Sequence, residues 1–146
     1  MPASQVHEFL TQISGETSWD ILCLQEFRKS SIRNVMTVAS HRVFTIPGDE
    51  EGSRKSLAII VHARWADGFI SGSFRTAGSA GSILLRWRHH TLFVMTSHLH
   101  PGGRLDSYEE SIMHMEFLLA SAPRGCIRVI GLDAQTRINM GDDLGE

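Results

Sequence analysis

The feature that most constrains the fold is a set of short apolar runs that have no polar face. They span residues 20–26, 57–61, 92–96 and 126–133. Runs of this length are typical of strands, and a strand that is apolar on both faces must be covered on both sides. We therefore expect stacked sheets with helices packed outside them.

Weaker patterns predict the remaining elements. Alternating or short apolar segments indicate further strands at 42–46, 69–74 and 83–87, with a hairpin connection over 76–82. Helical spacing predicts one helix near the start and a long one before the last strand. The apolar positions with this spacing are Val6, Phe9, Leu10 and Ile13 in the first helix, and Tyr108, Ile112, Met115 and Leu119 in the second. The stretch 137–146 has little apolar content, and we expect an irregular tail there.

Size and composition favour one globular domain. The chain has 146 residues, of which 42% are hydrophobic and 21% charged. Its formal net charge of -2 gives no global basic field, which weakens a nucleic-acid partner without excluding one. A bound cation would supply positive charge locally. Cys23 and Cys126 lie in apolar surroundings, and we expect both to be reduced core thiols.

No targeting signal is visible. The opening residues 1–5 lack a basic region followed by an apolar stretch, and no apolar run is long enough to span a bilayer. We therefore expect no signal peptide, no membrane partner and, by default, an intracellular location.

Polar residues follow three of the apolar runs. Glu26 ends the first, His98 and His100 follow the third, and Asp133 and Gln135 follow the last. Each of them alone fits a surface or capping residue. Together they supply two carboxylates, imidazole and an amide, which are the parts of a hydrolytic phosphoester site. One acid would hold a metal, the other would activate water, the amide would bind a phosphate oxygen, and an imidazole would assist the leaving group.

These segments resemble the motifs of the endonuclease/exonuclease/phosphatase superfamily. Residues 20–26 (DILCLQE) look like its D-I-x-x-L-Q-E strand, and 56–61 (SLAIIV) are similar to its G-x-A-I-L strand, with Ser in place of Gly. Residues 94–99 (VMTSHL) resemble x-x-T-x-H-L, and 131–135 (GLDAQ) resemble G-x-D-x-N. The four motifs occur in the family's order, within residues 17–136.

The resemblance implies a DNase-I-like fold, a four-layer α/β/β/α sandwich, and a phosphodiester hydrolase acting on DNA or RNA. It makes Glu26 the ligand of Mg²⁺, with Mn²⁺ as an alternative, and His98 and Asp133 catalytic. Gln135 stands where the family has Asn, which lengthens the amide arm by one methylene. The stretch 131–136 looks most like the endonuclease domains of non-LTR retrotransposons.

The resemblance also carries departures. The family opens with a strand that bears a metal-side Asn and closes with a strand that ends in Ser-Asp-His. We find neither within residues 1–146 and therefore expect a single partial domain that lacks the first and last strands. Such a domain would have impaired activity, because losing positioned electrostatic groups is costly in catalysis.

Two alternatives stay open. His98 and His100 are also compatible with a hydrolase of the metallo-β-lactamase type, although Gly102 and Gly103 stand where that family has further ligands. The other alternative is non-enzymatic: a catalytically inactive fragment derived from a retroelement, or a binding module.

Overall fold

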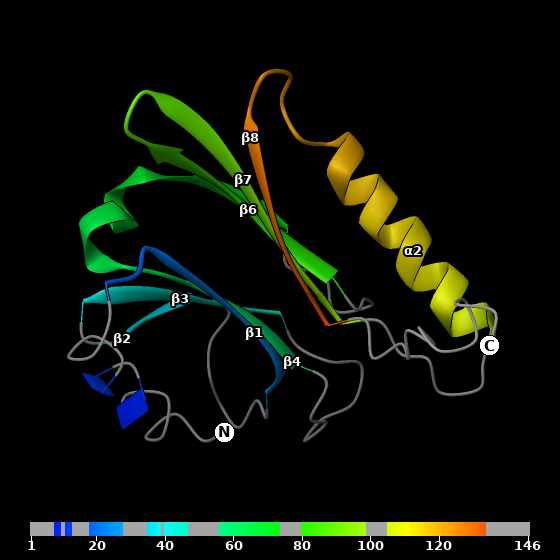
Figure 1. Cartoon of the computed structure of the whole chain (residues 1–146), viewed down its shortest axis with the longest axis horizontal. Coiled ribbons are helices and arrows are strands. Elements are labelled where there is room, and N and C mark those ends of the chain that lie inside the picture. The colour runs from blue at the N-terminus through cyan, green and yellow to red at the C-terminus, as the bar shows by residue number, and fades with distance from the viewer. Residues whose placement is uncertain are drawn as a thin grey trace, which may run out of the picture.

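The protein consists of two stacked β-sheets with one long helix on the outer face of the second (Figure 1). The computed structural model describes residues 8–9, 11–12, 18–27, 35–38, 40–46, 56–73, 80–98 and 105–133. The predicted stacking of sheets with a helix outside is therefore observed.

The first sheet has four antiparallel strands in the order β1-β4-β3-β2. They are β1 (Ile21–Phe27), β4 (Ser56–Val61), β3 (His41–Ile46) and β2 (Val35–Val38). Strand β4 lies between β1 and β3, which explains why Leu57 to Val61 are apolar without alternation: all five are at most 1% exposed.

The second sheet has the order β5-β6-β7-β8. Its strands are β5 (Phe69–Ser73), β6 (Ala80–Trp87), β7 (His90–His98) and β8 (Ile127–Asp133). The first three are antiparallel, whereas β8 runs parallel to β7. The parallel pair requires a crossover, which α2 (Leu105–Ala120) provides.

Alternate residues of both sheets meet in the main core. Phe44, Ile59 and Val61 from the first sheet pack with Ile83, Leu85, Leu92 and Val94 from the second, and all seven are at most 5% exposed. Trp65 and Trp87 pack against this cluster, so the structure supports core packing for these indoles.

A second cluster joins α2 to the outer face of the second sheet. Leu118 of α2 is 1% exposed and packs with Phe93 and Met95 of β7. Met115 and Leu119 lie on the predicted face, but the fully buried position is Leu118, which the predicted spacing omitted. The inward face is therefore rotated slightly relative to the prediction.

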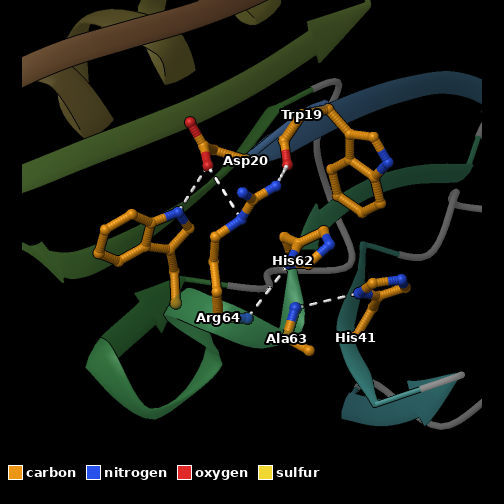
Figure 2. Close-up of polar contacts among 7 residues, drawn as sticks. Trp19, Asp20, His41, His62, Ala63 and Arg64 are labelled. Atoms are coloured by element: carbon orange, nitrogen blue, oxygen red, sulfur yellow. Dashed lines mark hydrogen bonds and ion pairs between the residues drawn. The ribbon is translucent and has the colours of Figure 1, made fainter. Parts of the chain in front are cut away.

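Polar and aromatic contacts tie together the end of the sandwich where β1 starts. Figure 2 shows Arg64 pairing with the Asp20 carboxylate at 3.3 Å and donating to the Trp19 carbonyl at 2.6 Å. The rings of His41 and His62 lie in contact in a tilted arrangement, with a centroid separation of 4.5 Å and an interplanar angle of 51°. Each imidazole accepts a backbone N–H through Nδ1, from Ala63 and Arg64 respectively.

These contacts fix the charge state of the two histidines. Burial lowers the pKa of His41, and the nearby His62 and Arg64 lower it further. Burial and Arg64 also lower the pKa of His62, while Asp20 opposes the shift. Both rings are therefore neutral near pH 7, with the proton on Nε2.

Most predicted elements are present, with strand bounds shifted by at most three residues; the largest shifts are at β6 and β7. The sequence patterns missed β2 and the 3-10 turn η1 (Ala63–Gly68). Of the predicted first helix, residues 8–9 and 11–12 are helical and the remainder lies outside the described residues, as does the tail 137–146. Both cysteines are unpaired thiols; Cys126 lies one residue before β8. Within the described residues, every helix is too short or too polar to cross a membrane.

Candidate active site

Three strands end together at one end of the sandwich. Strands β7 and β8 are parallel and in register, so His98 and Asp133 are direct neighbours across the ladder. Strand β1 of the first sheet faces β7 of the second (Figure 1), and Gln25 near the end of β1 hydrogen-bonds to Thr96 of β7. The ends of β1, β7 and β8 therefore converge, opposite the end that carries His41 and His62.

His98 and Asp133 form the central pair of this end. The His98 side chain is 3% exposed, and its Nε2 lies 3.7 Å from Oδ2 of Asp133, whose side chain is 37% exposed. The separation is that of an ion pair and is longer than a hydrogen bond. A buried imidazole beside a carboxylate that water can reach is an arrangement suited to acid–base chemistry.

Glu26 occupies an irregular position on β1. Leu24 pairs with Ala58 and Phe27 pairs with Ser56, so Gln25 and Glu26 together face a single residue of β4. This is the pattern of a β-bulge, which changes the direction of side chains and is frequent next to active sites. The structure describes the backbone of Glu26 but not its side chain, so its predicted role as a metal ligand remains a prediction.

Two further predicted residues, His100 and Gln135, lie outside the described residues. Their predicted roles therefore remain predictions. Within the described part of the chain, no three His, Cys, Asp or Glu side chains lie close enough to hold a metal ion.

A group of contacts that no sequence pattern indicates lies next to this pair. Gln25 Nε2 donates to the Thr96 hydroxyl at 2.9 Å, and Gly131 lies against Cys23. We call Cys23, Gln25, Thr96 and Gly131 the inter-sheet seam. Burial raises the pKa of the Cys23 thiol, while hydrogen bonds from the Gly131 backbone and Thr96 lower it in part.

Two solved structures show which fold this is. Over 98% of this chain, D. rerio TDP2 humanized by 14 mutations superposes with a TM-score of 0.61 at 15% identity. The endonuclease domain of TRAS1, a telomere-specific non-LTR retrotransposon, superposes over 94% with a TM-score of 0.57 at 16% identity. The fold is DNase-I-like.

This likeness confirms the predicted DNase-I-like fold. The chain spans 62% of the TDP2 chain and 55% of the TRAS1 chain. No protein-family model and no curated protein matches the sequence. Each of the four sequence motifs overlaps one strand: β1, β4, β7 or β8. The motifs on β1, β7 and β8 meet at the candidate site.

Proposed function

We propose that this chain is a metal-dependent hydrolase of phosphodiester bonds in DNA or RNA. The observation that carries the proposal is the buried His98 imidazole facing the half-exposed Asp133 carboxylate where β1, β7 and β8 end. The DNase-I-like fold supports it, because one structure with this fold is an endonuclease domain.

The two described side chains take different roles because their environments differ. Asp133 is open to solvent and orients or deprotonates the attacking water. His98 lies beside this carboxylate and assists the leaving oxygen as a general acid.

Two further roles, those of Glu26 and Gln135, are proposed from the sequence motifs. Gln135 holds a non-bridging phosphate oxygen through its amide. Glu26 holds Mg²⁺, or Mn²⁺, and the donor chemistry fits because carboxylate oxygens are the ligands that these hard cations prefer. The ion, when bound, offsets negative charge that develops on the phosphate. In a chain of net charge -2, such an ion would also add local positive charge toward a polyanion.

The test is a substrate panel with matched variants. The purified chain is incubated with Mg²⁺ or Mn²⁺ and, in separate reactions, with one substrate at a time. The substrates are single-stranded DNA, duplex DNA, RNA, an inositol phosphate and a small phosphodiester. We expect slow cleavage of a nucleic acid, in keeping with the impaired activity predicted from the sequence, and a further fall of about 10²-fold or more in Asp133→Asn. Unfolding curves of wild type and variant establish that both are folded.

The same panel addresses the non-enzymatic alternative. Nucleic-acid binding without turnover, unchanged by Asp133→Asn, would contradict the hydrolase proposal and favour a binding module. Cleavage that Zn²⁺ supports and Mg²⁺ does not would favour the alternative that uses His98 and His100.

A further inference from the structure

We propose that Gln25, Thr96 and Gly131 are positioning residues that lock the end of β1 against His98 and Asp133. The inference rests on the proposed function for its catalytic consequence. Its structural part, a lock between the two sheets at this end, stands on the contacts of the inter-sheet seam alone.

The first element of the lock is a directional hydrogen bond between sheets. Gln25 on β1 donates to Thr96 on β7 at 2.9 Å, although 71 positions separate them in sequence. Thr96 is 0% exposed. Water has no access to the Thr96 hydroxyl, and removing that hydroxyl leaves the part-buried Gln25 amide without this partner.

The second element is a close approach that only glycine permits. A Cβ at Gly131 would lie 2.5 Å from Cys23 Cβ and 2.9 Å from its Sγ, and 3.7 Å from Gln25 Nε2. Strand β8 therefore lies directly on β1 at this point. Any larger residue would push the two strands apart.

The seam is connected to the site by strand geometry. Thr96 and His98 are two positions apart on β7, as are Gly131 and Asp133 on β8, so each pair lies on one face of its strand. Gln25 directly precedes Glu26. A displacement of the seam is therefore carried to all three strand ends at once.

The polar character of the seam distinguishes it from ordinary core packing. The rest of the interface between the sheets is the apolar cluster around Phe44, Ile59 and Val94. Apolar contacts hold the sheets together but tolerate small shifts along the strands, since they have no preferred direction. A hydrogen bond with defined geometry fixes that shift, and so fixes the spacing between the end of β1 and the His98–Asp133 pair on the second sheet.

The experiment compares Thr96→Val, which removes the hydroxyl, with Thr96→Ser, which retains it. Thr91→Val is the matched control, because it makes the same change at the other end of β7. Amide hydrogen exchange is measured on the strand ends (Ser97, His98, Leu132, Asp133) and on the strand starts (Leu92, Phe93). Steady-state kinetics are measured on the nucleic acid that wild type cleaves.

We expect Thr96→Val to lower protection at the strand ends about 10-fold while the strand starts stay protected. Its kcat should fall about 10²-fold with KM nearly unchanged, because the site is displaced rather than removed. Thr96→Ser should recover most of both effects, and Thr91→Val should show neither.

Two results would overturn the inference. One is a uniform loss of protection along β7 and β8, which would make the seam a general stabiliser. The other is a Thr96→Val enzyme that turns over like wild type. If wild type has no activity but Thr96→Val loosens only the strand ends, the lock is supported and the proposed function fails.

Discussion

The close contact between β8 and β1 makes Gly131→Ala the most informative stability variant. The added Cβ would lie 2.5 Å from Cys23 Cβ, whereas carbon atoms in contact prefer about 3.5–4.0 Å. About 1 Å must therefore open between two strands that belong to different sheets. Cys23 Cβ is fixed to the backbone, so a rotamer change cannot relieve the clash.

We expect Gly131→Ala to lower the free energy of unfolding by about 2 kcal/mol, within the usual range for overpacking. For a chain of this size the midpoint of thermal unfolding should fall by about 4–8 °C. Urea unfolding followed by circular dichroism gives the free energy, and an unchanged m-value would show that the transition still exposes the same surface.

Two double variants test the cause. Cys23→Ala retains the Cβ, so combining it with Gly131→Ala should leave most of the clash. Cys23→Gly removes the Cβ as well, and in combination with Gly131→Ala it should cost less than the two single variants added together. A Gly131→Ala protein as stable as wild type, or full rescue by Cys23→Ala, would refute the reasoning.

Two further predictions concern other parts of the fold. In the folded protein the pKa values of His41 and His62 lie below their usual 6.5, so the unfolded chain binds more protons than the folded one. The contribution of these two groups to the free energy of unfolding should therefore be constant above about pH 6.5. It should fall as the pH drops through their folded-state pKa values. Urea unfolding between pH 7.5 and 5 measures this slope; it should flatten in the His41→Asn/His62→Asn double variant, and an equal slope in that variant would contradict the assignment. On α2, Leu118→Ala should lower the free energy of unfolding by about 2–5 kcal/mol because Leu118 is 1% exposed. Phe117 is 56% exposed, so Phe117→Ala should change it by no more than about 0.5 kcal/mol. Equal losses in the two variants would show that α2 packs through another face.

Much of this fold could be predicted because its central strands carry an unambiguous signal. Residues 57–61 are apolar throughout, since β4 is covered by neighbours on both edges and by side chains on both faces. Strand β2 has only four residues, Val35–Val38, between polar segments, which is too short for a periodic pattern to emerge. The face of α2 was misjudged by one position because Leu118 and Leu119 are both apolar and only the packing partners select between them.

The candidate site was predictable in part. A carboxylate or histidine after a buried run can be recognised locally, so His98 and Asp133 could be proposed from sequence. Their pairing depends on the parallel register of β7 and β8, which no local pattern specifies. The Gln25–Thr96 hydrogen bond spans 71 positions and joins two sheets, so it could be found only in the folded structure.

We propose that a divalent cation bound at Glu26 lies beside His98 and Asp133. Paramagnetic broadening by Mn²⁺ tests it directly, because the effect falls steeply with distance. His41 and His62 serve as internal references, since about 17 Å of strand, at about 3.3 Å per residue, separates Ile21 at the start of β1 from Glu26.

We predict that low Mn²⁺ broadens the NMR signals of His98 and Asp133 and leaves those of His41 and His62 sharp. Excess Mg²⁺ should reverse the effect, and Glu26→Gln should weaken it strongly. Broadening of His41 and His62 in preference to His98, or broadening of His98 that is unchanged in Glu26→Gln, would contradict the account.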